Sequence, residues 1–164
     1  MTPAVKAAER AGIAFTLHKY EHDPAHAAYG AEAAEALGLL PARVFKTLVV
    51  SQNKGLGVAI VPVTGKLNLK ACASALAVKR AEMADPKVAE RTTGYVVGGI
   101  SPLGQKKQLP TIVDESALAF ETVFVSAGRR GLEIELAPDD LIRLTRAQTG
   151  AIADSLHRAG THST

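Results

Sequence analysis

The sequence predicts a single mixed α/β domain, with a mixed or largely antiparallel sheet and helices packed outside it. Its 164 residues, 47% of them hydrophobic and 21% charged, suit one soluble domain with a sizeable core. Strand and helix patterns follow one another without the regular β-α alternation that is typical of a parallel sheet. Neighbouring apolar segments separated by short turns further predict hairpins, and therefore antiparallel pairing.

Capping residues and periodicity predict the elements of the first part of the chain. Thr2 is a favourable N-cap and Pro3 suits the first helical position, so a helix begins here. Alternating apolar and polar residues then predict a strand, which ends before Pro24. Glycines follow both predicted helices. The expected elements are a helix at 3–11, a strand at 14–20 and a helix at 31–37.

A lysine interrupts the most apolar predicted strand, at 44–50. Alternation places Lys46 on one face and Thr47 on the other, and the remaining residues of both faces are apolar. This pattern predicts a central and largely buried strand. A lysine there must reach water, find an anion or lose its proton. The structural alternative is an edge lysine whose ammonium extends to solvent.

The rest of the chain is expected to hold short helices and strands around a glycine-rich loop at 98–104. A turn at 53–55 and an apolar segment at 56–63 complete a hairpin, and Pro62 predicts fraying or an edge there. Helices are expected at 69–76, 86–93 and 138–145, and strands at 95–97, 111–114, 122–126 and 132–136. Turns are expected at 64–66 and 128–131. We expect one domain at 1–156 and a flexible polar tail at 157–164.

Composition argues against several classes of protein. No apolar run approaches the roughly 20 residues of a membrane span, and the first residues lack a secretory signal, so we expect a cytoplasmic protein without a membrane partner. The single cysteine, Cys72, rules out an internal disulfide and has the alanine-rich setting of a small buried residue. A net charge of +3 permits a polyanionic partner without requiring one.

Metal and nucleotide motifs are weak. His18, His22 and His26 would share one face of a helix, but Pro24 and the preceding strand pattern argue against that helix. We therefore expect no metal and no cofactor. The glycine and lysine at 65–66 do not form a phosphate-binding P-loop, because Ile60 occupies the position of its first glycine. With few aromatic residues and no tryptophan, a base-stacking platform is not expected.

Three further features are candidates for chemistry, each with a plain structural alternative. The loop at 98–102 could direct N–H groups at a carbonyl or carboxylate oxygen, or be an ordinary turn. Glu133 and Glu135 share one face of the last predicted strand, so one of them could pair with Lys46, or both could be solvated. Basic pairs at 79–80, 106–107 and 129–130 could bind phosphates or lie on an ordinary surface.

Taken together, seven segments resemble the bacterial YbaK family of aminoacyl-tRNA deacylases, most closely the type that acts on cysteinyl-tRNA(Pro). The matching segments are 1–6, 20–24, 44–48, 82–86, 93–107, 109–114 and 125–136. The resemblance extends over nearly the whole chain to about Leu144, and the segment at 93–107 is long enough to be specific. It implies a mixed α/β domain whose sheet curls into a barrel-like pocket.

The resemblance also implies which residues line that pocket. Lys46 matches the family's catalytic lysine. The family's Gly-x-x-x-Pro loop matches Gly98, Gly99, Ile100, Ser101 and Pro102. The other substrate-binding positions carried over are Tyr20, Tyr29, Thr47, Ser126 and Glu133. Two of them depart from the family pattern, because position 29 more often holds phenylalanine and position 133 more often holds aspartate.

A mechanism follows from the residues and the resemblance together. Since no convincing Ser-His-Asp or Cys-His set is present, the Lys46 ammonium and the loop N–H groups are expected to position an ester and stabilise its oxyanion. The resemblance suggests that the substrate's own thiol attacks the ester carbonyl, a lyase-like step. It implies aminoacyl-tRNA, chiefly tRNA(Pro), as partner, with prolyl-tRNA synthetase as a further candidate. The alternatives are a non-catalytic tRNA- or synthetase-binding module and an editor of alanyl-tRNA(Pro).

Overall fold

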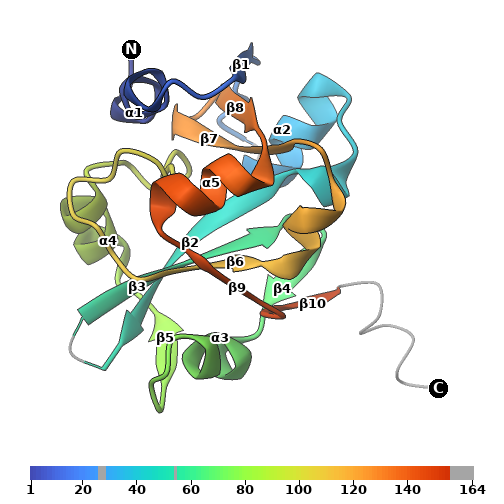
Figure 1. Cartoon of the computed structure of the whole chain (residues 1–164). Helices are drawn as coiled ribbons and strands as arrows, with labels where there is room; N and C mark the ends of the chain where they lie inside the picture. The colour runs from blue at the N-terminus through green and yellow to red at the C-terminus, as the bar shows by residue number, and fades with distance from the viewer. Residues whose placement is uncertain (26–28, 54, 156–164) are drawn as a thin grey trace.

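The computed structural model describes residues 1–25, 29–53 and 55–155 (Figure 1). The helices are α1 (Pro3–Ala11), α2 (Tyr29–Leu37), α3 (Leu69–Ala75), α4 (Pro86–Thr93) and α5 (Pro138–Thr145), with 3-10 turns η1 (Pro41–Arg43) and η2 (Glu115–Ala119). The strands are β1 (Phe15–Lys19), β2 (Phe45–Gln52), β3 (Gly55–Pro62), β4 (Gly65–Leu67), β5 (Ala81–Met83), β6 (Thr111–Asp114), β7 (Val123–Arg129), β8 (Leu132–Leu136), β9 (Gln148–Gly150) and β10 (Ala153–Ser155). The expected tail at 157–164 and His26 lie outside the described residues.

Two main sheets build the domain. The larger has the strand order β5-β2-β3-β6-β9, in which β2 is antiparallel to β3 and β5 while β6 is parallel to β3 and β9. The smaller is antiparallel, with the order β1-β8-β7, and β4 and β10 form a short separate pair. The prediction of a mixed α/β domain is therefore confirmed, and so are the hairpins β2-β3 and β7-β8.

The two main sheets meet where β2 begins. Val44 forms a parallel bridge with Phe124 of β7, which joins the sheets at one corner without closing them into a barrel. Phe45, Val49 and Ile60 of the larger sheet share a core with Val125 and Ile134 of the smaller one. The opposite face of the larger sheet packs on α3, where Val50, Val61 and Cys72 are buried. Both faces of β2 are therefore covered, as its apolar pattern predicts.

Local capping explains where α1, α3 and α4 begin or end. The Thr2 side chain accepts a hydrogen bond from the Val5 N–H, and the Asn68 side chain accepts one from the Ala71 N–H. Gly12 and Gly94 adopt left-handed backbone conformations directly after α1 and α4, which stops each helix. Figure 1 shows α1 beside the smaller sheet and α3 beside β5 and β9 of the larger one.

One predicted strand is wrong. Residues 95–97 form an irregular segment, because the Val97 N–H donates to Glu90 Oε2 at 2.8 Å and the Tyr95 hydroxyl donates to the Leu103 carbonyl. These bonds hold the segment against α4 and its own loop. The three-residue strands β4, β5, β9 and β10 were not predicted, since each is too short to show a period. Among the described helices, none has both the length and the apolar character required to cross a bilayer.

Candidate functional site

A cavity of about 350 Å³ opens at the edge of β2, between the two main sheets, α2, α4 and the glycine-rich loop. It opens there because β5 pairs only with residues 50–52 of β2, which leaves the edge beside Lys46 to Leu48 uncovered by β5. The lining residues are Tyr20, Gly30, Ala31, Phe45, Lys46, Thr47, Leu48, Val49, Val63, Met83, Ala84, Pro86, Ala89, Val97, Gly98, Ile100, Ser126 and Glu133.

Lys46 is the cation of this cavity. Its side chain is half-buried beside α2, where a Cβ on Gly30 would lie 3.9 Å from the Lys46 Cβ. Burial lowers the pKa of Lys46. Within the described part of the chain, no carboxylate forms an ion pair with it. An ammonium in this setting is poised to bind an anion, or an oxygen that gains negative charge, from a ligand.

Glu133 lies in the same cavity on the second sheet. It is only 6% exposed, and burial raises its pKa to about 8, so its carboxyl is largely neutral at pH 7. The hypothesis of a solvated pair with Glu135 is therefore wrong. Glu133 lies opposite Ser126 across the β7-β8 ladder, and both residues face the cavity. Burial also raises the pKa of Tyr20, and the nearby Glu133 adds to that shift.

Thr47 carries an unsatisfied polar atom at the cavity wall. Its Oγ1 is buried and has no hydrogen-bond partner among the described residues. A buried hydroxyl without a partner is unfavourable, typically by about 1–3 kcal/mol, unless a ligand or water supplies the bond. Thr47 is thus suited to bind a polar group of a ligand next to Lys46.

The glycine-rich loop contributes only part of its length to the cavity. Gly98 and Ile100 line it, and Gly98 has a φ of 93° that favours glycine. Gly99 is buried against the β7-β8 turn, since a Cβ there would lie 2.7 Å from the Arg129 Cα. Ser101 and Pro102 are buried outside the lining, and the Ser101 Oγ accepts a hydrogen bond from the Leu103 N–H. Of the loop, therefore, Gly98 and Ile100 face the cavity.

Several cavity residues were not anticipated. Tyr29 begins α2, but its side chain lies outside what the structure describes. Its neighbour Gly30 forms the wall, because a Cβ there would lie 2.4 Å from the Val63 Cγ1. Other lining residues are apolar and include Met83 and Pro86. Gly30 lies just before the helix predicted at 31–37, so the sequence pattern did not mark this wall, and the apolar lining residues carried no signal either.

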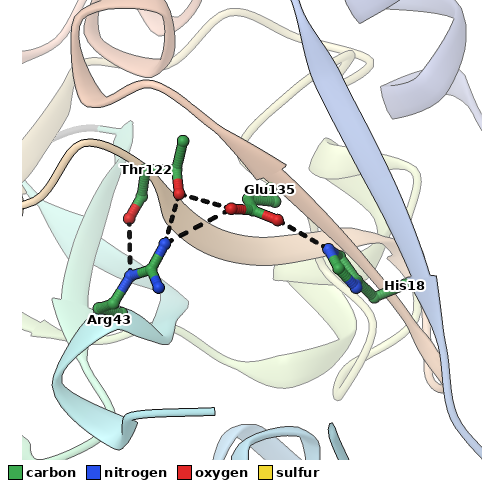
Figure 2. A network of polar contacts seen from close by, with 4 residues as sticks. All are labelled: His18, Arg43, Thr122 and Glu135. Carbon is green, nitrogen blue, oxygen red and sulfur yellow. Dashed lines mark hydrogen bonds and ion pairs between the residues drawn. The ribbon is translucent and has the colours of Figure 1, made fainter.

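A polar network fixes the strand that carries Lys46 against the strand that carries Glu133 (Figure 2). Arg43, the last residue of η1, donates from Nε to the Thr122 carbonyl at 3.0 Å, and its Nη2 contacts the Thr122 hydroxyl and Glu135 Oε2. Glu135 accepts from the Thr122 hydroxyl at 2.6 Å and pairs with His18 at 2.9 Å. These bonds, led by that from Thr122, lower the pKa of Glu135.

The two histidines that the structure describes, His18 and His22, do not share a site. His18 belongs to the Glu135 network, whereas His22 bonds the buried Glu32 at 2.7 Å. In the described residues, no cluster of three His, Cys, Asp or Glu side chains has the arrangement of a metal site. Cys72 is fully buried, and burial raises the pKa of its thiol, which fits a structural role.

The fold and the cavity define a small α/β domain that can hold a polar ligand near a lone ammonium, a buried carboxyl and a glycine loop. A family model described as the aminoacyl-tRNA editing domain matches residues 22–144. The chain belongs to this aminoacyl-tRNA editing family.

Individual relatives agree with this membership. The chain is 48% identical over 120 residues, 73% of each protein, to EbsC of Enterococcus faecalis, which is named as a candidate Cys-tRNA(Pro)/Cys-tRNA(Cys) deacylase. It is similar in structure to a candidate trans-editing enzyme for prolyl-tRNA synthetase, with a TM-score of 0.81, 25% identity, and coverage of 94% of this chain and 99% of that one. A hypothetical protein, APE2540, has a TM-score of 0.83, 25% identity, and coverage of 93% and 100%.

Proposed function

We propose that this protein is a trans-editing hydrolase that deacylates mischarged cysteinyl-tRNA(Pro). Membership of the editing family and the name of the 48% identical relative support the reaction class. The observation that carries the mechanism is Lys46, a half-buried ammonium in the cavity without an ion-pair partner in the described chain. Such a charge can stabilise the oxyanion that forms when an ester carbonyl is attacked.

The cavity supplies positioning and electrostatic stabilisation. In the proposed complex, Lys46 and the Gly98 N–H contact the ester oxygen, and the Thr47 hydroxyl binds a polar group beside it. Tyr20, Ser126 and Glu133 contact the rest of the aminoacyl group. Gly99, Ser101 and Pro102 support the loop from behind, and Ile100 closes it over the cavity. Tyr29, where this chain departs from the family pattern, belongs to the same proposed site.

The substrate provides the nucleophile in this proposal. The cysteinyl sulfur attacks its own ester carbonyl, a C–S bond forms, and the C–O bond to the terminal ribose breaks. The thiol proton ends on the ribose oxygen, so that tRNA leaves with a free hydroxyl and the amino acid leaves as a cyclic thioester. This step needs no protein nucleophile, metal or cofactor.

The decisive experiment measures release of amino acid from cysteinyl-, alanyl- and seryl-tRNA(Pro) and from cysteinyl-tRNA(Cys), under excess substrate. We expect multiple turnover on the cysteinyl substrates. We expect Lys46→Met to lower the deacylation rate by about a hundred-fold or more. Lys66→Met removes an exposed lysine on β4 and serves as the matched control. Binding without turnover would indicate a non-catalytic tRNA- or synthetase-binding module instead. Turnover of alanyl-tRNA(Pro) alone would exclude thiol attack and indicate an alanyl editor.

A further inference from the structure

Arg130 holds the cavity loop from outside. Its side chain extends from the β7-β8 turn and is exposed, yet its Nη2 donates to the Val97 carbonyl at 3.0 Å. Val97 directly precedes Gly98, and both residues line the cavity. The Val97 N–H is held separately, by Glu90 Oε2 of α4 at 2.8 Å. The two polar groups of Val97 are thus held by side chains from two different elements.

The guanidinium of Arg130 is itself held in place. Its Nη1 lies 3.5 Å from His22 Nε2, and His22 Nδ1 lies 2.7 Å from Glu32 Oε1. Because arginine only donates, His22 Nε2 is the acceptor, so the His22 proton lies on Nδ1 and faces the carboxylate. Glu32 is only 4% exposed and also accepts from the Asp23 N–H at 2.8 Å. The Glu32–His22 pair therefore orients Arg130.

A planar peptide links this outer contact to the inside of the cavity. The Val97 carbonyl and the Gly98 N–H belong to one trans peptide unit, so they point in opposite directions. When Arg130 holds the carbonyl toward the surface, the Gly98 N–H is turned the other way, toward the cavity that Gly98 lines. No acceptor for that N–H is found among the described residues, whereas the Gly99 N–H is already bonded to the Val96 carbonyl at 2.8 Å.

We propose that Arg130 is a positioning residue, which aims the Gly98 N–H at the ester oxygen by holding the Val97 carbonyl. This rests on the proposed deacylase function and adds to it a residue that lies outside the cavity. Arg130 does not contact the reacting atoms; it acts through one peptide group, with His22 and Glu32 as its supports.

The test compares Arg130→Ala with Arg129→Ala. Both variants remove one exposed arginine from the same hairpin, but Arg129 lines a separate groove beside Leu17 and Val5. Two readouts are needed: the single-turnover deacylation rate over a range of enzyme concentrations, which gives the maximal rate and KM, and the ¹H–¹⁵N signal and hydrogen exchange of the Gly98 amide without substrate. Melting temperatures of both variants control for folding.

We expect Arg130→Ala to lower the single-turnover rate by about ten- to a hundred-fold, with little change in KM and a displaced Gly98 amide signal. Arg129→Ala should leave the rate and the Gly98 amide signal unchanged. Arg130→Lys should recover part of the rate, because a lysine can still donate a hydrogen bond to the Val97 carbonyl. Equal rates in the two alanine variants would overturn the proposal. A higher KM with an unchanged rate in both alanine variants would also overturn the proposal, since that result indicates that the arginines bind phosphate.

The two readouts separate this inference from the proposed function. If the wild-type protein deacylates no tRNA, the proposed function fails, but the Gly98 amide still reports whether Arg130 positions it. A Gly98 signal that changes in Arg130→Ala and not in Arg129→Ala then supports positioning. A signal that is the same in wild type and both variants refutes it.

Discussion

Lys46 on β2 and Glu133 on β8 line one cavity from two different sheets without forming an ion pair. Burial lowers the pKa of Lys46 and raises the pKa of Glu133. Each group is therefore shifted toward its neutral form, where a direct pair would have stabilised both charges. Because Lys46 and Glu133 do not pair with each other, both side chains remain available to a ligand in the cavity.

Lys46→Met is expected to leave the protein at least as stable as wild type while removing its activity. The variant replaces a half-buried ammonium by an apolar chain of similar length, which removes a desolvation penalty. We expect the free energy of unfolding to rise by about 1 kcal/mol at pH 7. Since the folded-state pKa of Lys46 is lowered, the stability of the wild type should rise as the pH approaches about 10.5. The difference in free energy of unfolding between Lys46→Met and wild type should then disappear.

Urea unfolding of Lys46→Met and Lys66→Met at pH 7 and pH 10 measures this difference. A marked destabilisation by Lys46→Met at pH 7 would show that the ammonium is paired in the folded protein and would contradict the site described above.

Glu133→Gln is expected to change how stability depends on pH. The folded-state pKa of Glu133 is about 8 and its ordinary value is 4.5, so the folded protein binds one more proton between these values. Glu133 therefore makes its full contribution to the free energy of unfolding below about pH 4.5. This contribution falls as the pH rises toward 8, by up to about 1.4 kcal/mol per pH unit. Glutamine mimics the neutral carboxyl and removes that slope.

Thermal unfolding between pH 5 and pH 9 tests the Glu133 prediction, with Glu121→Gln as a control at an exposed carboxylate. The stability of Glu133→Gln relative to wild type should increase across this range. A difference that is independent of pH would mean that Glu133 is ionised in the folded protein.

Gly30→Ala is expected to disturb the cavity wall. The new Cβ would lie 2.4 Å from the Val63 Cγ1, so either the Val63 side chain or α2 must shift. Overpacking of this kind costs about 1–3 kcal/mol, which exceeds the helical gain of about 0.5–1 kcal/mol from alanine. Because α2 covers the Lys46 side chain, deacylation should fall together with stability.

The double variant Gly30→Ala/Val63→Ala provides the matched test of that wall. It removes the atom that clashes, so it should be more active than Gly30→Ala alone, as measured by deacylation rate and melting temperature. Gly55→Ala, where a Cβ would meet nothing closer than 3.9 Å, should behave as wild type. Failure of the Val63 change to restore any activity would refute the steric explanation.

Glu135→Gln is expected to destabilise the contact between the strands that carry Lys46 and Glu133. Glu135 accepts from Thr122 and pairs with His18 and Arg43, and these contacts lower its pKa (Figure 2). We expect a loss of about 1 kcal/mol at pH 7. A lowered carboxyl pKa contributes stability above its unfolded-state value, and that contribution disappears as the pH falls through the folded-state pKa.

Denaturation of Glu135→Gln and Glu121→Gln at pH 7 and pH 3 checks the network. The destabilisation by Glu135→Gln should shrink at pH 3, and Glu121→Gln should show little effect at either pH. An equally large loss at pH 3 would attribute the effect to packing and not to charge.

Local signals account for most of the elements. Thr2, Asn68 and Asp85 each accept a hydrogen bond at the start of a helix, and that interaction involves residues only a few positions apart. The same signals fail at 95–97, where three apolar residues resemble a strand but have no neighbouring strand to pair with. Pairing partners are distant in sequence, so their absence is invisible in the local pattern.

The sequence by itself determined the capped helices, the two hairpins and a lysine in an apolar strand, because each depends on neighbouring residues. Only the tertiary structure decided that Glu133 is buried while Glu135, on the same face of β8, is tied to Arg43 and His18. It also decided that Arg130 reaches Val97, 33 residues away. Burial, pKa and hydrogen bonding of these groups depend on what packs across the fold, and strand alternation carries no information about that.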